Sequence, residues 1–154
     1  MNTPVSSYKN RILAALPKAE INRLAPHLSP VNLKQEQTLL DGKAKYAYFL
    51  EEGIASVVAT VEDGTTVEIG VIGFDGIVGI PILLGAGSAP GRTFIQIAGS
   101  GFRIESAVLK RNLSARASCG NICRNMYRHF WYRLLRQPFV TVCIASKKDS
   151  HDGC

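Results

Sequence analysis

Hydrophobic and polar positions follow two different periods along the chain, and the change falls near residue 30. Residues 8–28 carry apolar side chains at helical spacing, first Ile12, Leu13 and Leu16 and then a second set after Pro17. A proline ends one helix and is tolerated at the start of the next. The sequence therefore predicts two short helices in this segment.

From residue 31 to about residue 104 the apolar runs become short and rich in β-branched and aromatic residues. The runs that predict strands are VNLK, TLL, YAYFLEE, IASVVATV, TTVEIGVI, TFIQIAG and FRIES, separated by Gly, Pro, Asp and Asn. Between two of them, Asp63-Gly64 supplies the positive-φ turn of a hairpin. Strands this close, with no long helices between them, favour an antiparallel sandwich or barrel.

Helical spacing returns after the predicted strands, over residues 105–116 and again over residues 121–136. Apolar residues recur at every fourth position of the second segment, and Pro138 should end it. We divide the chain into a domain over residues 1–116 and a basic helical tail over residues 117–154, which shows no recognisable helix-turn-helix. In the segment over residues 121–136, the apolar residues at every fourth position are Ile122, Met126, Phe130 and Leu134.

The formal net charge of +6 is concentrated in the last part of the chain. Residues 1–109 carry nine Lys/Arg and ten Asp/Glu, whereas residues 110–154 carry nine Lys/Arg and two Asp/Glu. A basic tail is typical of a segment that binds nucleic acid, anionic lipid or an acidic partner. The alternative is a solvated segment without a partner. No apolar run is long enough for a membrane span, and the first residues lack a signal-peptide pattern, so we expect a cytoplasmic protein.

The residue types that support catalysis or metal binding are poorly placed for either. All four cysteines lie in the tail, and Cys119 and Cys123 are not followed by a second Cys/His pair at zinc-finger distance. No histidine lies in the strand region, which argues against a metal-dependent barrel enzyme. Glu68 and Asp75 fall in a strand and a turn, where carboxylates are usually structural. We therefore expect no metal site and no enzymatic activity.

Several motifs occur in an order that resembles one known family. YAYFLEEGIASVV resembles its Y-F-hydrophobic-x-x-G segment, and DGTTVEIGVIGFDGIVG resembles its strand, loop and glycine turn. With the leading segment RILAALPKAEINRLAPHLSPVNLKQEQTLLDGK, residues 10–110 resemble the cyclic-nucleotide-binding domain of Crp/Fnr-type bacterial transcription regulators. The resemblance implies a mainly β fold, a jelly-roll β-barrel with flanking N- and C-terminal helices.

The glycine-rich stretch GIPILLGAGSAPGRT, residues 79–93, has the chemistry of an anion site. Small residues let backbone N–H groups approach a phosphate, a short helix directs its N-terminus at it, and an arginine supplies a planar donor fork. This stretch stands where the family keeps its phosphate-binding cassette. The resemblance implies that the ligand contacts are Gly79, Ile80, Pro81, Arg92 and Thr93.

Ile80 departs from the family pattern. Nucleotide-binding members carry a glutamate at this position, which accepts a hydrogen bond from the ribose hydroxyl. Isoleucine cannot accept that bond, and the loss of a buried polar partner costs roughly 1–3 kcal/mol. A cyclic nucleotide, another small anion and no ligand at all remain open, and no other cofactor is expected.

The resemblance implies a sensor domain of a transcription regulator. Family members continue into a helix that pairs two subunits and then a DNA-reading domain, but residues after Arg116 do not follow that pattern. We therefore expect a truncated or frame-shifted member that does not bind specific DNA sequences by itself. The alternatives are a ligand-free module that dimerises through its C-terminal helix, and nonspecific nucleic-acid binding through the arginines and aromatics of the tail.

Overall fold

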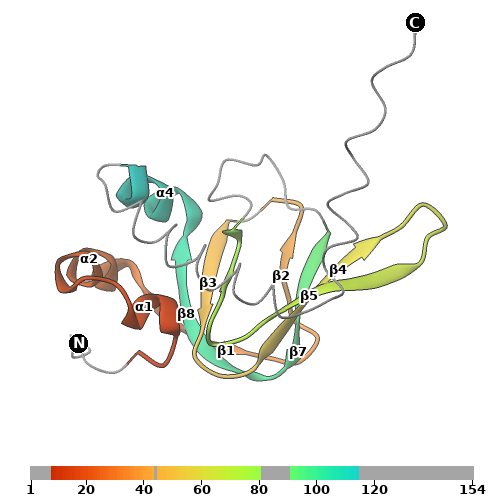
Figure 1. Ribbon diagram of the computed structural model, residues 1–154, viewed down its shortest axis with the longest axis horizontal. Helices are drawn as coiled ribbons and strands as arrows, with labels where there is room; N and C mark the ends of the chain where they lie inside the picture. The colour runs from red at the N-terminus through yellow and green to blue at the C-terminus, as the bar shows by residue number, and fades with distance from the viewer. Residues whose placement is uncertain (1–7, 44, 81–90, 115–154) are drawn as a thin grey trace, which may run out of the picture.

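The computed structural model describes residues 8–43, 45–80 and 91–114 (Figure 1). These residues form short helices at each end and strands between them. In chain order the elements are α1 (Arg11–Ala14), α2 (Lys18–Leu24), the 3-10 turn η1 (Ala25–His27), β1 (Ser29–Leu33), β2 (Thr38–Asp41), β3 (Tyr46–Leu50), β4 (Ile54–Thr60), β5 (Thr66–Ile72), β6 (Ile77–Val78), β7 (Arg92–Ile97), β8 (Gly99–Glu105) and α4 (Ser106–Ser114).

The strands form two antiparallel sheets of four strands each. One sheet has the order β1-β8-β3-β6 and the other has the order β2-β7-β4-β5. Strands distant in sequence are neighbours in both sheets, since β8 pairs with β1 and β3, and β7 pairs with β2 and β4. This arrangement confirms the prediction of a mainly β jelly-roll fold with flanking helices.

Between the two sheets lies a hydrophobic cluster that we call the inter-sheet core. It draws on strands of both sheets, so it holds them face to face. Each large apolar side chain buried in such a core contributes roughly 1.5–3 kcal/mol to stability. Its buried members are Leu33, Leu40, Tyr48, Leu50, Ala55, Val78 and Ile95, with Val31, Leu39, Tyr46 and Ile72 packed against them.

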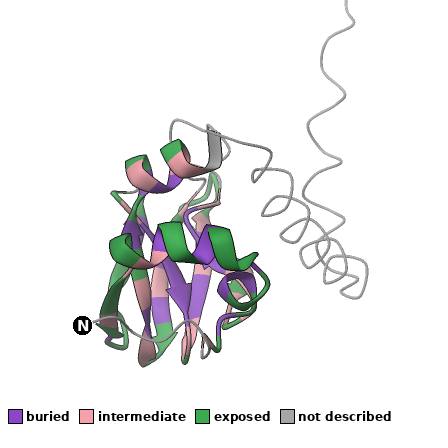
Figure 2. Ribbon diagram, turned by 90° about the vertical axis from the view of Figure 1, so that its left-hand side faces the viewer, coloured by how far each residue is buried: buried purple, intermediate pink, exposed green. Residues whose placement is uncertain are grey.

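The helices cover the opposite face of the β1-β8-β3-β6 sheet, where a second cluster, the helix-layer core, is buried. Strand β3 divides its side chains between the two cores, because Ala47 and Phe49 face the helices while Tyr48 and Leu50 face the other sheet. Figure 2 shows the helices with exposed outer faces and buried residues turned toward the strands. The buried members are Ile12, Leu13, Leu16, Ile21, Leu24, Ala47, Phe49, Ile77, Ile104 and Leu109.

Asn10 fixes the start of α1 against two turns of the strand region. Its side-chain oxygen accepts hydrogen bonds from the backbone N–H groups of Ile12 (3.1 Å) and Leu13 (3.2 Å), which caps the helix. Its side-chain amide donates to the carbonyl oxygens of Leu50 (2.9 Å) and Gly76 (3.0 Å). The residue is fully buried, so these partners replace water completely.

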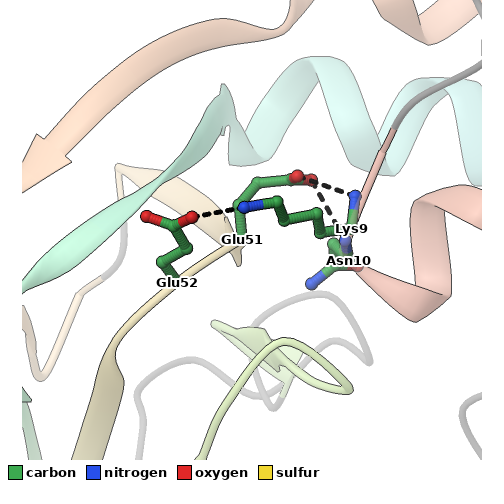
Figure 3. A network of polar contacts seen from close by, with 4 residues as sticks. All are labelled: Lys9, Asn10, Glu51 and Glu52. Atoms are coloured by element: carbon green, nitrogen blue, oxygen red, sulfur yellow. Dashed lines mark hydrogen bonds and ion pairs between the residues drawn. The ribbon is translucent and has the colours of Figure 1, made fainter.

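A carboxylate network continues this attachment on the surface (Figure 3). Glu51 accepts hydrogen bonds from the backbone N–H groups of Lys9 (2.7 Å) and Asn10 (3.1 Å), while the Lys9 ammonium group pairs with Glu52. The β3–β4 turn, which carries both glutamates, is therefore tied to the residues that lead into α1.

The local predictions can be compared with these elements one by one. The two helices over residues 8–28 and the boundary at Pro17 are confirmed, and α4 confirms the helix expected from residue 105. The Asp63-Gly64 hairpin is also confirmed: Gly64 has a φ of 84°, and the Asp63 carboxylate accepts from the Thr65 N–H at 2.8 Å. Strand β6 was not predicted, because only two residues of DGIVG pair with β3. The division at residue 116 and the helix over residues 121–136 lie outside the described residues.

Candidate functional site

Gly79 and Ile80 follow strand β6, where the chain leaves the sheet. Gly79 has a φ of 103°, which favours glycine, and a side chain there would lie 3.6 Å from the Cα of Ala47 and 3.7 Å from the carbonyl oxygen of Tyr46. The half-buried side chain of Ile80 packs against the helix-layer core. The isoleucine that replaces the family's glutamate therefore has a packing role. The rest of the cassette, including Pro81, lies outside the described residues.

Arg92 and Thr93 begin strand β7 and lie on opposite faces of its sheet. Thr93 is 3% exposed and pairs with Leu40 and Val57 on the side that also carries Ile95, so it faces the inter-sheet core. Arg92 is exposed on the outer side, and its guanidinium carbon lies 5.2 Å from the centre of the Phe94 ring. Of the two adjacent predicted contacts, the structure turns Thr93 inward and Arg92 outward.

Gly91 brings the chain into β7 very close to strand β4. Its φ is 97°, and a Cβ atom there would overlap the carbonyl oxygen of Val58. The entry to the strand is therefore available only to glycine, and this close approach fixes the position from which Arg92 and Thr93 leave the backbone.

Arg92 borders a polar hollow on the outer side of the β2-β7-β4-β5 sheet. The hollow has a volume of about 400 Å³ and holds one carboxylate, that of Asp41, the residue paired with Arg92 across β2 and β7. No ion pair of Arg92 occurs within residues 8–43, 45–80 and 91–114, so no carboxylate of these residues neutralises its guanidinium group. The lining residues are Asp41, Gly42, Val58, Thr60, Thr66, Gly91 and Arg92.

The inner wall opposite β7 carries an aromatic and basic group that sequence reasoning missed. Tyr46 and Tyr48 follow each other on the inner face of β3, with ring centres 6.4 Å apart. The guanidinium carbon of Arg103 lies 4.7 Å from the centre of the Tyr46 ring, and the Lys45 ammonium group lies 5.4 Å from it. We call these four residues the tyrosine–arginine wall. The alternation of FRIES already put Arg103 and Ile104 on opposite faces, but did not say which face was the inner one.

Burial raises the pKa of the Tyr48 hydroxyl above its ordinary value, and the positive charge of Arg103 opposes that rise. Tyr48 is therefore a neutral phenol at physiological pH and keeps its hydroxyl proton as a hydrogen-bond donor.

The carboxylates considered for acid/base chemistry have other partners. Glu68 accepts a hydrogen bond from the buried hydroxyl of Ser56 across strands β4 and β5. Within the part of the chain that the structure describes, no three His, Cys, Asp or Glu residues come together as a metal site. The cysteines of the tail lie outside that part. Among the described helices, none has the length and hydropathy needed to cross a membrane.

Comparisons with known proteins find similarity in structure alone. No protein-family model matches the chain, and no curated protein matches it in sequence. The regulatory subunit of a cAMP-independent protein kinase A from Trypanosoma brucei is similar with a TM-score of 0.64 and 16% identity, over 89% of this chain and 46% of that chain. This chain thus spans less than half the length of that subunit.

Bacterial transcription regulators are similar to the same degree. The N-terminal domain of a transcriptional regulator from Streptomyces coelicolor A3(2) has a TM-score of 0.57 and 21% identity, over 84% of this chain and 92% of that chain. The c-di-GMP responsive global regulator CLP from Xanthomonas campestris has a TM-score of 0.63 and 17% identity, over 77% of this chain and 60% of that chain.

These similarities agree with the two antiparallel sheets and the flanking helices described above. They confirm the resemblance that the sequence motifs predicted. The chain has the fold of the cyclic-nucleotide-binding domains of Crp/Fnr-type regulators and protein kinase A regulatory subunits.

Proposed function

We propose that this chain is the sensor module of a Crp/Fnr-type transcription regulator and that it binds a nucleotide or another small anion between its two sheets. The proposed ligand contacts are the cassette residues at both ends of the segment over residues 81–90. They are Gly79, Ile80 and Pro81 on one side and Thr93 on the other. Arg92, which the sequence also indicated, lies on the outer face of β7 and is not a contact of a ligand between the sheets.

The observation that carries this proposal is the position of Thr93. It places a hydroxyl-bearing side chain on the inner face of β7, two residues after a glycine that the close approach to β4 requires. A hydroxyl at such a position suits the oxygens of a phosphate. Gly79 gives the other end of the cassette the same backbone freedom.

The neighbours in structure support a ligand class rather than one ligand. The kinase subunit from Trypanosoma brucei is described as cAMP-independent, and the Xanthomonas regulator as c-di-GMP responsive. Ile80 removes the acceptor for a ribose hydroxyl, so a ligand that relies on that bond loses about tenfold or more in affinity. We therefore expect a nucleotide-like anion, and cyclic AMP is only one candidate.

A route for the signal runs from the site to α4. The backbone N–H of Ser106, at the start of α4, donates to the carbonyl oxygen of Lys45 at 2.9 Å, next to the tyrosine–arginine wall. Leu109 holds the same helix in the helix-layer core. A ligand that moves β3 or β8 would therefore shift α4 and the residues that follow it.

The test is a thermal-shift screen of the full chain against cyclic AMP, cyclic GMP, cyclic di-GMP and linear nucleotides. A ligand at one hundred times its dissociation constant adds about 2.7 kcal/mol of stability. We expect at least one of these probes to raise the Tm, and the rise to be lost in Thr93→Val. Arg23→Ala is a matched control on the exposed face of α2 and should keep the response. No rise with any probe would contradict the proposal.

A further inference from the structure

The tyrosine–arginine wall faces the space between the sheets, although its charged ends are exposed at the rim of that space. Arg103 is the pairing partner of Tyr48, which belongs to the inter-sheet core. The next residue, Ile104, is buried in the helix-layer core on the other face of β8. Strand alternation therefore turns Arg103 inward, the opposite of the orientation of Arg92 in β7.

The charged groups of the wall have no hydrogen-bonding or ionic partner among the described residues. The side chains of Arg103 and Lys45 make no hydrogen bond or ion pair in that part of the chain. Lys9, by contrast, is paired with Glu52. Among the described residues of β3 and β8, Glu105, the pairing partner of Tyr46, is the carboxylate on the same face of the sheet. The two positive charges of Arg103 and Lys45 exceed this single negative charge. Stacking on Tyr46 orients the guanidinium plane and leaves its N–H donors free.

The cassette begins beside the strand that carries the wall. A Cβ atom on Gly79 would lie 3.6 Å from the Cα of Ala47 and 3.7 Å from the backbone carbonyl oxygen of Tyr46. A ligand held by the backbone at Gly79 is therefore next to β3, whose inner face carries Tyr46. Thr93 faces the same interior from the opposite sheet.

We propose that Arg103 is a second, inward-facing phosphate contact of the bound nucleotide, held in place by the ring of Tyr46. This inference rests on the proposed function and deepens it. Arg103 supplies the planar cationic donor on the β8 side, and Thr93 supplies a hydroxyl on the β7 side. Tyr46 is a positioning residue, because it acts on the ligand through the guanidinium group.

The experiment measures, by isothermal titration calorimetry, the Kd of the full chain for whichever of cyclic AMP, cyclic GMP or cyclic di-GMP raises its Tm. Arg103→Ala should raise that Kd about tenfold or more, because a charged hydrogen bond to phosphate is lost. Arg103→Lys keeps the charge but not the planar fork, so its loss should be smaller. Arg23→Ala removes the same side chain from the surface of α2 and should leave the Kd unchanged.

The outcomes separate this inference from the proposed function. A wild-type Kd in Arg103→Ala, with binding lost in Thr93→Val, would overturn the role of Arg103 and leave the sensor function standing. A wild-type Kd in Arg103→Lys would overturn the role of the planar fork, because lysine keeps the charge without it. No binding of any probe to the wild-type chain would overturn both. Circular dichroism of each free variant shows whether it is folded, and Arg103→Lys carries the test if Arg103→Ala is not.

Discussion

Replacement of Asn10 by alanine tests how the N-terminal helix is held to the strands. The substitution removes the cap of α1, which is worth about 0.5–2 kcal/mol. It also leaves the carbonyl oxygens of Leu50 and Gly76 without the side-chain amide that now donates to them at 2.9 and 3.0 Å. A buried acceptor that loses its partner costs about 1–3 kcal/mol. We expect Asn10→Ala to lower the free energy of unfolding by about 3 kcal/mol.

Urea denaturation followed by circular dichroism measures this loss. With a slope of about 2 kcal/mol per molar urea, the midpoint should fall by about 1.5 M. Asn32→Ala is the matched control, because Asn32 is exposed on β1 and its loss should cost less than about 0.5 kcal/mol. A loss for Asn10→Ala no greater than that of the control would refute the reasoning.

Two further predictions concern backbone strain and surface charge. Gly91→Ala should lower the free energy of unfolding by at least about 2 kcal/mol, because the new Cβ atom would overlap the Val58 carbonyl oxygen at a positive φ. The control is Gly42→Ala, where φ is 71° and no atom lies near the new Cβ. It should lower the free energy of unfolding by about 1 kcal/mol in the same urea assay. Equal losses would contradict the overlap. The hydrogen bond from Lys9 lowers the pKa of the Glu52 carboxyl. The Lys9–Glu52 pair therefore stabilises the fold at pH values above the ordinary glutamate pKa, and this stabilisation is lost as the pH falls through the folded-state pKa of Glu52. An NMR titration should show the Glu52 pKa rising toward its ordinary value in Lys9→Ala, and an unchanged pKa would count against the pairing.

Most of the fold could be predicted, because most of its strands are short runs of β-branched and aromatic residues bounded by turn residues. The hairpin turn at Asp63-Gly64 and the break at Pro17 depend on backbone preferences that neighbouring residues cannot override. Strand β6 is different, because its two residues pair with β3 through contacts that are distant in sequence. Its pairing follows from the order of strands in the sheet, which no local pattern encodes.

The sequence predicted that Arg92 and Thr93 begin a strand, but it did not predict which of the two faces the interior. The motif located Arg92 and Thr93 correctly at the start of a strand, yet adjacent strand residues necessarily point to opposite faces. Which of the two points inward depends on the register of β7 with β2 and β4. Ile80 could be recognised as a departure from the family pattern, but its packing against the helix-layer core became visible only in three dimensions.

Arg103 was missed because its significance depends on a partner far away in sequence. Tyr46 lies more than fifty residues earlier, and the two meet only because β3 and β8 are neighbours in one sheet. An arginine alternating with apolar residues in a strand is ordinarily a solvated side chain. The pairing of β8 with β3 places this one on the face of the sheet that is turned toward the inter-sheet space.

The most direct test of the sensor function is an NMR titration of the ¹⁵N-labelled chain with cyclic AMP, cyclic GMP and cyclic di-GMP. The account predicts that one of them shifts the backbone amide signals of Gly79, Thr93 and Tyr46, while that of Asn32 on β1 stays in place. Unchanged spectra at millimolar concentrations of all three, or shifts confined to residues outside the inter-sheet space, would contradict it.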